Sequence, residues 1–588
     1  MILQSLKSYY DRMIGDSDTK VAPPGFYSQR IHFALVIERD GKVKQVKDLR
    51  EGDDKKKSPV DIIVPEPVKL KRTANVEPNF LWDNSSYVLG IESIDEGLSS
   101  QEKEKRISRV KKYFDSFKSY HKEMADKCED IGLKAVVAFL ESWKAEMIEE
   151  IDYAEEIPGA NIVFILDEDG SRFIHQRPEV IDFWINYKSG KASEVIAECL
   201  ITGERSSIAR IHQPIKGVTG AQTTGAAIVS FNIESFKSYN KTQNFNAPVS
   251  EKAAFAYTTA LNYLLKSERQ RMQLGETTIV FWTERRSPVE DILGFAINPE
   301  IASASDQGKI RDFLRAAKNA ERLPDNDIDP DVMFYILGIS PNASRLAIRF
   351  FHASTVGDIK NRIGEHFCDI EITRNYPDSE SEYPGLWRLI RETAVQKKSD
   401  NINPLLAGSL TRSIFTGGDY PRAILTSTLV RIKADGDINY YRACLIKGYL
   451  SRYNRIRNIK WEVSMSLNNE LVDAGYRLGR LFAVLEKVQQ DANPGLNTTI
   501  KDRYFSSASA TPRVVFPQLM RLSQHHMAKL TKINVGLKVE REKLLQEIVD
   551  VLPSFPSHLN LESQGMFALG YYQQRKDLFT SKKNKEGV

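Results

Sequence analysis

Apolar residues recur along the chain with two different periods. Between Ile107 and Tyr120 they return every three or four positions, which predicts an amphipathic helix. The charged segment 42–57 has no apolar period and is predicted to be an exposed loop. Short runs rich in β-branched and aromatic residues predict strands. These runs are 162–166, 227–231, 277–282, 332–339 and 345–351.

The last two runs predict one antiparallel hairpin. The intervening SPNAS segment has the composition of a turn. In the second run, Leu346, Ile348 and Phe350 alternate with polar or small residues, among them Arg345 and Arg349. Because side chains alternate across a strand, we expect the three apolar residues on one face and the two arginines on the other.

Strand-like runs become rare beyond residue 402. From Leu471 to Val488 the apolar residues step at helical spacing, and a polar, turn-rich segment occurs at 397–404. We therefore predict an α+β protein. A mixed α/β N-terminal region with antiparallel strands, residues 1–402, is expected to precede a C-terminal α-helical bundle, residues 403–588.

The composition is that of a folded, globular protein. Of 588 residues, 41% are hydrophobic and 27% are charged, and a chain of this length usually forms more than one domain. The four cysteines lack metal-site spacing, so we expect reduced thiols in a cytoplasmic protein. No run of 18 apolar residues and no signal peptide is present, and we expect no membrane partner.

Positive charge is concentrated in the C-terminal third. The net charge is +4 overall, but residues 403–588 contain 27 Lys and Arg against 16 Asp and Glu. Within them, residues 442–460 hold six cations and no acid, interleaved with Tyr449 and Tyr453. Cations combined with aromatic residues are typical of a surface that tracks a nucleic-acid backbone and stacks bases. A solvated helix face or a contact with an acidic protein explains the same pattern.

Motifs that would indicate catalysis are incomplete. The glycine-rich loop 217–226 has the glycine spacing of a phosphate-binding loop, but two alanines replace its Lys and hydroxyl residue. The acidic segment 324–331 begins like an EF-hand, but Pro330 occupies the glycine position and Ile336 the twelfth. The sequence contains no zinc-protease or serine-hydrolase motif. We expect a protein that is not an enzyme and has no catalytic residue, metal or cofactor.

Six long segments, in order over nearly the whole chain, carry a family resemblance. They are MILQSLKSYY (1–10), KRTANVEPNFLWDNSSYVLG (71–90), GVTGAQTTGAAIVSFN (217–232), APVSEKAAFAYTTALNYLL (247–265), LGISPNASRLAIRFF (337–351) and TTIKDRYFSSASATPRVVFPQLMRLSQHHMAKL (498–530). With these segments the chain resembles the large-subunit family of the type I-C CRISPR interference complex (Cascade).

The resemblance implies a non-catalytic subunit near the 5′ handle of a guide RNA. Guide pairing would read most of the target, while this subunit recognises the protospacer-adjacent motif, promotes R-loop formation and steadies the displaced strand. The implied partners are the guide RNA complex, double-stranded target DNA, a guide-end-capping subunit, backbone subunits, small subunits and a recruited helicase-nuclease. The alternatives are a scaffold that reads no motif, and a nuclease.

The resemblance also suggests which residues meet the flanking duplex. Cations would contact phosphates, whereas Asn and Gln side chains would read base edges. The candidates are Lys69, Lys71, Arg72, Asn79, Asn84, Lys216, Gln222, Arg345 and Arg349. Local capping by Asn84, a purely structural glycine loop and surface salt bridges of the arginines are the competing interpretations.

The displaced strand would be held by cations of the C-terminal third, without sequence preference. The candidates are Arg442, Arg452, Arg455, Arg457, Lys460, Lys501, Arg503, Arg513 and Arg521.

The resemblance further implies that the bundle is made a second time, as a separate small subunit. Met465 is the candidate internal start and would give a product of 124 residues, 465–588. The codons of Trp461, Glu462 and Val463 can spell UGG-GAG-GUN, which contains a ribosome-binding sequence. We hypothesise that one gene makes both products.

Overall fold

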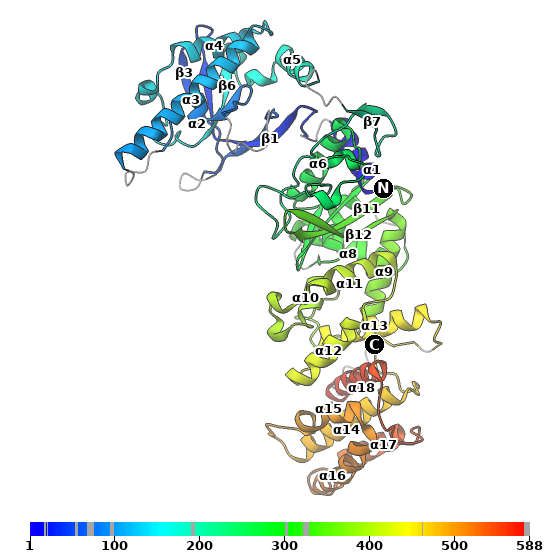
Figure 1. Cartoon of the computed structure of the whole chain (residues 1–588). Coiled ribbons are helices and arrows are strands. Elements are labelled where there is room, and N and C mark those ends of the chain that lie inside the picture. The colour runs from blue at the N-terminus through cyan, green and yellow to red at the C-terminus, as the bar shows by residue number, and fades with distance from the viewer. Residues whose placement is uncertain are drawn as a thin grey trace. The chain divides into compact units, whose positions relative to one another are not determined.

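Figure 1 shows the chain as a computed structural model. The structure describes residues 1–16, 19, 21–52, 57–67, 76–93, 99–189, 195–299, 304–321, 328–460 and 462–580. Contacts divide the chain into two compact units. The first contains Met1–Ile215 and Ala227–Tyr263, and the second contains Lys216–Ala226 and Leu264–Val588. The glycine-rich loop therefore belongs to the second unit.

The first unit is built on a four-stranded sheet. Its strands and covering helices are β2 Phe33–Ile37, β3 Val43–Asp48, β5 Trp82–Asn84, β6 Asn161–Leu166, α3 Ser100–Ala125 and α4 Ile131–Ser142. The strand order is β3-β2-β6-β5. β2 and β6 run parallel, and the two outer pairs are antiparallel. All five residues of β2 are buried, so both faces of this strand are covered.

Smaller elements complete the first unit. They are α1 Ile2–Ile14, β1 Phe26–Ile31, β4 Val60–Pro65, α2 Ser85–Val88, α5 Pro178–Ser189, β7 Ile196–Glu198, β8 Arg205–Ser207 and α6 Glu251–Lys266, whose last residues belong to the second unit. β1 pairs with β4 and β7 with β8, both antiparallel.

The second unit is built on an antiparallel sheet. Its strands are β9 Arg271–Leu274, β10 Thr277–Thr283, β11 Met333–Asn342 and β12 Arg345–Thr355, in the order β12-β11-β10-β9. β11 and β12 form the predicted hairpin. A bulge beside Gly338 interrupts the alternation, because Gly338 pairs with Phe350 while Ile339 pairs with Ile348. Ile348 is consequently 45% exposed, and its predicted place beside Leu346 and Phe350 is wrong.

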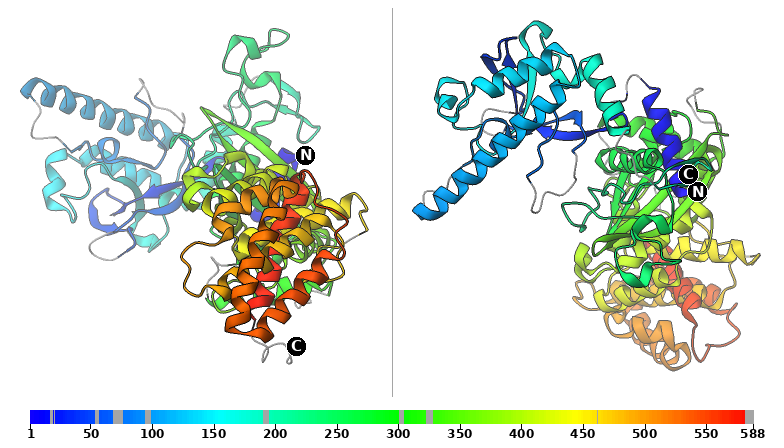
Figure 2. Two further views of the ribbon diagram at one scale, coloured as in Figure 1. Left: turned by 90° about the horizontal axis from the view of Figure 1, so that it is seen from below. Right: turned by 45° about the horizontal axis from the view of Figure 1, so that its top comes forward.

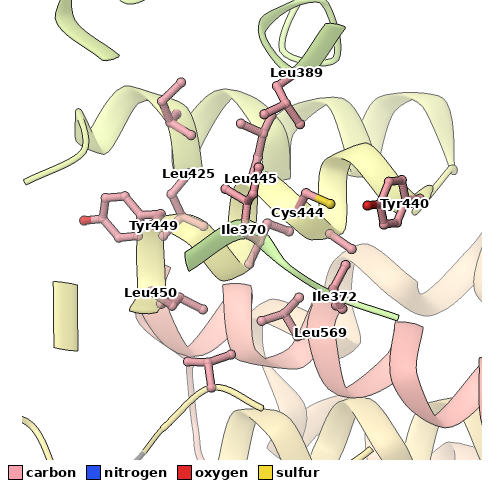
Figure 3. Close-up of a cluster of buried hydrophobic side chains, with 14 of the residues drawn as sticks. Ile370, Ile372, Leu389, Leu425, Tyr440, Cys444, Leu445, Tyr449, Leu450 and Leu569 are labelled. Carbon is pink, nitrogen blue, oxygen red and sulfur yellow. The ribbon is translucent and has the colours of Figure 1, made fainter. Parts of the chain in front are cut away.

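Helices make up the rest of the second unit. They are α7 Val289–Ala296, α8 Ala304–Lys318, α9 Val356–Ile370, α10 Leu386–Arg391, α11 Pro404–Thr416, α12 Arg422–Asp435, α13 Tyr440–Ile456, α14 Ala474–Ala492, α15 Ile500–Ala510, α16 Pro512–Ile533, α17 Val535–Val549 and α18 Leu561–Phe579. One hydrophobic core connects the sheet with these helices. Figure 3 shows its middle, where Leu445 of α13 lies between Leu389 of α10 and Leu569 of α18.

The structure confirms the α+β fold class. The predicted strands 162–166, 277–282, 332–339 and 345–351 correspond to β6, β10, β11 and β12. The predicted helix lies within α3, and the region beyond residue 402 is helical. No helix in the described part of the chain is long and apolar enough to cross a lipid bilayer.

Two local predictions are wrong. Residues 227–231 form no strand, because β-propensity alone does not create a strand without a ladder to a neighbour. Part of the segment 42–57 is not a loop: residues 43–48 form β3, since pairing with the buried strand β2 outweighs the charged composition.

The division between the units does not fall near residue 402. The core of the second unit contains both Ile402 and Leu406, so it continues across the expected boundary. Separate folding of residues 403–588 stays a prediction.

Candidate nucleic-acid interface

The candidates between residues 69 and 84 are structural wherever the structure describes them. Lys69, Lys71 and Arg72 lie outside the described residues. Asn79 is only 3% exposed, and its backbone N–H donates to Asp83 Oδ2 at 2.8 Å. A side chain this deeply buried cannot reach a base edge, so the predicted reading role of Asn79 is wrong.

Asn84 caps a helix. Its Oδ1 accepts from the backbone N–H of Ser86 at 3.1 Å, at the first turn of α2. Its Nδ2 donates to the carbonyl oxygen of Gly159 at 2.8 Å. Because local backbone groups engage both ends of the amide, the capping interpretation describes Asn84 and the base-reading one does not.

The glycine-rich loop lies beside the β11–β12 hairpin within the second unit. Gly220 has φ +78°, and a Cβ there would lie 3.3 Å from Pro341 Cγ at the hairpin end. Positive φ and the close neighbour both favour glycine at this position. The structure thus brings together two segments, the loop and the hairpin, that the sequence places more than 100 residues apart.

Strand β9 anchors the loop. Thr219 Oγ1 donates to Gln273 Oε1 at 2.9 Å, and Arg271 Nη2 donates to Thr219 Oγ1 at 3.1 Å. Arg271 is not among the residues predicted from the sequence, because a single cation in a short strand has no distinguishing pattern. A loop held in this way presents its side chains in a fixed place.

The loop and hairpin expose most of the remaining candidates. Lys216, Gln222 and Arg349 are exposed, and Arg345 is half-buried. Arg349 Nε donates to Ser340 Oγ at 2.6 Å across the hairpin. No carboxylate is involved in that bond, so Arg349 keeps its charge available for an anion.

Arg442, the first cation of the basic stretch, is interior. Its guanidinium is fully buried on α13. Nη2 donates to Asp435 Oδ2 at 2.5 Å, Nη1 donates to the Asp437 carbonyl at 2.8 Å, and Nε lies 3.3 Å from Glu392 Oε2. The prediction that Arg442 contacts DNA is wrong, because two carboxylates already neutralise it inside the protein.

Arg452 is interior as well. Its Nε donates to Asp369 Oδ2 at 2.9 Å and its Nη1 to the Ser413 carbonyl at 3.0 Å. Nearby, the Lys447 ammonium donates to the carbonyls of Cys368 and Asp369, and burial lowers its pKa. With full burial and a carboxylate partner, Arg452 does not belong to the predicted DNA surface.

The end of the basic stretch reaches the surface. Arg455 and Arg457 are 45% and 41% exposed, and Lys460 is exposed. Arg455 Nη1 lies 2.5 Å from Asp369 Oδ1, and Arg457 Nη1 lies 2.7 Å from Asp419 Oδ1. These residues stay candidates for contact with DNA, but two of the three carry an internal partner.

The aromatic residues of this stretch do not present free rings. Tyr449 is buried, and the Tyr453 ring stacks on it with centroids 5.9 Å apart. The Arg457 guanidinium covers Tyr453 at 3.9 Å from the centroid. Base stacking, which the sequence pattern suggested, therefore has no support from these tyrosines.

The last four candidates lie on α15 and α16. Lys501 is half-buried, and Arg503, Arg513 and Arg521 are exposed. The sequence has no Asp or Glu between positions 504 and 539. Because α16 lies wholly within this acid-free segment, its cations have no acidic neighbour on their own helix.

Further cations on α16 were missed. Lys529 and Lys532 are exposed, as is His525, and Lys529 Nζ donates to Asn493 Oδ1 at 2.6 Å. The absence of acids over this segment is the sequence signal that could have identified them. We define the α16 face as Arg513, Arg521, Lys529 and Lys532.

The thiols are free and mostly buried. Cys128, Cys199 and Cys444 are buried, and Cys368 is exposed. Among the residues that the structure describes, no group of three or more His, Cys, Asp or Glu is placed to hold a metal ion.

One comparison with known proteins identifies the family. A family model described as CRISPR-associated protein (Cas_Csd1) matches residues 6–579. No curated protein matches the chain. The match spans both units and confirms the resemblance. The chain belongs to the Csd1 family of CRISPR-associated proteins.

Proposed function

We propose that the chain is the non-catalytic large subunit of an RNA-guided type I-C CRISPR surveillance complex. It recognises the protospacer-adjacent motif in double-stranded DNA, promotes local unwinding and R-loop formation, stabilises the displaced strand and helps to recruit the helicase-nuclease. Membership of a CRISPR-associated family supports this assignment. The proposed partners are the guide RNA complex, target DNA, a guide-end-capping subunit, backbone subunits, small subunits and the helicase-nuclease.

The observation that carries the proposal is a pair of different surfaces on the second unit. At the sheet, the anchored glycine loop exposes Lys216 and Gln222 beside the hairpin. Because glycine has no side chain, the backbone of such a loop can come close to a groove of duplex DNA. At the far end, the α16 face is cationic and free of acids, as a surface that tracks a single strand requires. Helices α11–α13 lie between the two (Figure 1).

The interior ion pairs of α13 favour a scaffold as the second candidate. Arg442 and Arg452 are neutralised within the protein, so these two arginines contribute rigidity rather than DNA contacts. A scaffold predicts that the complex discriminates the flanking motif equally well without this chain. A nuclease predicts metal-dependent cutting of the bound strands.

The deciding experiment compares guide-loaded complexes assembled with and without the chain. Each is titrated onto a duplex target whose flanking motif is intact or scrambled, at several salt concentrations and with Mg²⁺ present. We expect motif discrimination only when the chain is present, and no cleavage. Equal discrimination without the chain overturns the proposal in favour of the scaffold, and cleavage by the complex without the recruited nuclease overturns the non-catalytic assignment.

Matched variants locate the recognition. Lys216→Ala with Gln222→Ala removes two exposed side chains, one just before the glycine loop and one within it, and is expected to reduce motif discrimination. Gln307→Ala with Lys309→Ala changes the same residue types on exposed positions of α8 and is expected to leave discrimination intact. Equal effects of the two pairs would remove the loop from the recognition site.

A further inference from the structure

The first unit carries a second basic surface, on helix α3. From position 103 to 112 six of ten residues are Lys or Arg, and one is acidic. Figure 1 and Figure 2 show the N-terminal half of this long helix extending past the neighbouring elements of its unit. The apolar period of this segment predicts the helix but gives its cations no role.

The opposite side of α3 fixes the helix to its unit. Val110 and Phe117 are buried, and the Tyr113 ring stacks on Tyr87 of α2 with centroids 4.6 Å apart. The imidazole ring of His121 is buried too, and its Nδ1 donates to the Phe117 carbonyl at 2.8 Å. The aromatic residues of α3 therefore pack inward, and the cations are held on a rigid support.

Among the described residues, the outward side of α3 presents three lysines without acidic partners and one arginine that has a partner. Lys105, Lys111 and Lys112 are exposed, and none of them forms an ion pair or side-chain hydrogen bond within the described structure. Arg109 is 53% exposed, with Glu92 at 3.5 Å. Three other exposed lysines of the same unit differ from these, because each forms an ion pair with a carboxylate. They are Lys44 with Asp167, Lys122 with Glu141 and Lys127 with Glu123.

We propose that this α3 surface, Lys105, Arg109, Lys111 and Lys112, binds the sugar-phosphate backbone of double-stranded DNA without reading its sequence. Unpaired lysines attract phosphates through charge alone. Seven residues of helix rise about 10 Å, and duplex DNA carries about six phosphates over that length. Stacking against exposed aromatic rings adds to the binding of single strands, and α3 offers no such platform because its aromatic residues face inward. The surface therefore fits a duplex.

This inference rests on the proposed function, since it adds a second contact with the target duplex. The test uses the guide-loaded complex containing the full chain and a duplex that has neither a guide match nor the motif. The logarithm of the affinity is plotted against the logarithm of the salt concentration. For the variant K105Q/K111Q/K112Q we expect the magnitude of the negative slope to fall by about 2.7, because each lost phosphate contact contributes about 0.9.

Two control variants separate contact from overall charge. The variant K44Q/K122Q/K127Q changes the net charge by the same amount at paired lysines and is expected to keep the slope. The variant K105R/K111R/K112R preserves the cations and is expected to keep it as well. A slope that is unchanged in K105Q/K111Q/K112Q, or that falls equally in K44Q/K122Q/K127Q, overturns the inference.

A crosslinking experiment gives a second measurement that does not depend on affinity. Ser108→Cys provides a thiol for a photoreactive label on the exposed side of α3, and Ser142→Cys provides one on α4. Both are made in a Cys368→Ser background, because Cys368 is the exposed cysteine. We expect duplex crosslinks from position 108 and none from position 142. Crosslinks from position 108 to guide RNA instead of DNA overturn the assignment.

The two proposals fail in different ways. Motif discrimination by the unmodified complex, together with an unchanged slope in K105Q/K111Q/K112Q, would remove the α3 contact and leave the proposed function intact. Loss of discrimination with a normal α3 contribution to the slope would remove the motif-reading function while the backbone contact stands.

Discussion

Arg452 on α13 and Asp369 on α9 form a buried ion pair, with Nε donating to Oδ2 at 2.9 Å. Asp369 also accepts two hydrogen bonds from Arg455. The Arg452 guanidinium lies over the Tyr420 ring, 4.7 Å from its centroid, and Nη1 donates to the Ser413 carbonyl. One carboxylate thus pairs with two cations, and Arg452 joins α9, α11 and α13 in the second unit.

Arg452→Ala is expected to destabilise the protein and to leave its salt-dependent DNA binding unchanged. Removing one member of a buried pair leaves desolvated polar groups behind, which typically costs about 3–5 kcal/mol. Urea unfolding measures the loss. Arg457→Ala is the control, because its pair with Asp419 is exposed and such pairs are worth about 1 kcal/mol or less. A stable Arg452→Ala protein with a flattened salt slope would restore Arg452 to the DNA surface.

The apolar and turn patterns of the sequence predicted the individual helices and strands that depend on neighbouring residues. The hairpin of β11 and β12 follows from two apolar runs and the turn between them, and the helical period of α3 is visible in its sequence. The density of cations along the sequence did not predict which of them lie at the surface. Asp369 precedes Arg452 by 83 residues, so no local window reveals that this cation is neutralised inside the protein.

The candidate interface could be predicted from the sequence only in part, because its residues come together through tertiary contacts. The glycine loop and hairpin were predicted separately. Their close approach at Gly220 and Pro341 depends on the tertiary fold, so no local pattern predicts it. Asn84 was open to two interpretations, since capping and base reading use the same amide chemistry. On α16 the relevant signal was the lack of acids rather than the density of cations, and a search for cation-rich stretches passed over Lys529 and Lys532.

Neutralising the α16 face is expected to weaken binding of the displaced strand without affecting stability. Single strands lose about 0.7 in salt slope per phosphate contact, so R513Q/R521Q/K529Q/K532Q should lower the slope by about 2.8. The slope is measured with the guide-loaded complex on an R-loop substrate. As a control, K309Q/R311Q/R315Q/R412Q removes four exposed cations elsewhere in the second unit. An equal fall in both variants would mean that net charge, and not the α16 face, is responsible.

Acid is expected to destabilise the first unit through His121. Its Nε2 accepts from the Leu81 N–H at 2.9 Å, and its Nδ1 donates to the Phe117 carbonyl. Burial lowers the pKa of His121 to about 4, below the ordinary value of 6.5. The unfolded state therefore binds a proton more readily. The stabilisation is complete above pH 6.5 and is lost as the pH falls toward 4.

Urea unfolding at pH 7.5 and pH 5.0 measures this effect. Linkage attributes to His121 about 2 kcal/mol of the stability lost between these values. His121→Gln cannot titrate and is expected to show a smaller loss by that amount, while His558→Gln, at an exposed position, is expected to behave like the unmodified protein. An identical pH dependence in all three proteins would contradict the assignment.

Gly479→Ala is expected to separate α14 from α18. A Cβ at Gly479 would lie 2.0 Å from the Phe567 carbonyl oxygen, and one at Gly570 would lie 2.1 Å from the Tyr476 carbonyl oxygen. Overpacking at a helix contact costs about 1–3 kcal/mol, which urea unfolding detects. Gly308→Ala in α8 meets nothing within 4 Å, so the better helix propensity of Ala should leave stability equal or higher. A neutral Gly479→Ala variant would show that the two helices are not in close contact.

The internal start at Met465 predicts two products from one gene. A C-terminally tagged gene should yield the full chain and a fragment of 124 residues, 465–588. Met465→Leu should remove only the fragment, because it eliminates the start codon and conserves the side-chain volume, and Met520→Leu should leave both products. A single band from the unmodified gene would refute the second product.

The structure adds a requirement for that fragment. In the full chain, Tyr572 of α18 donates its hydroxyl to the Thr373 carbonyl at 3.0 Å, and a Cβ at Gly565 would lie 3.1–3.3 Å from Leu425, Ile446 and Leu450. All of these neighbours precede Met465. The isolated fragment would expose this side of α18, so we expect it to be less stable alone than with another subunit covering it. Urea unfolding of the purified fragment, compared with the full chain, measures the difference, and equal stability would contradict it.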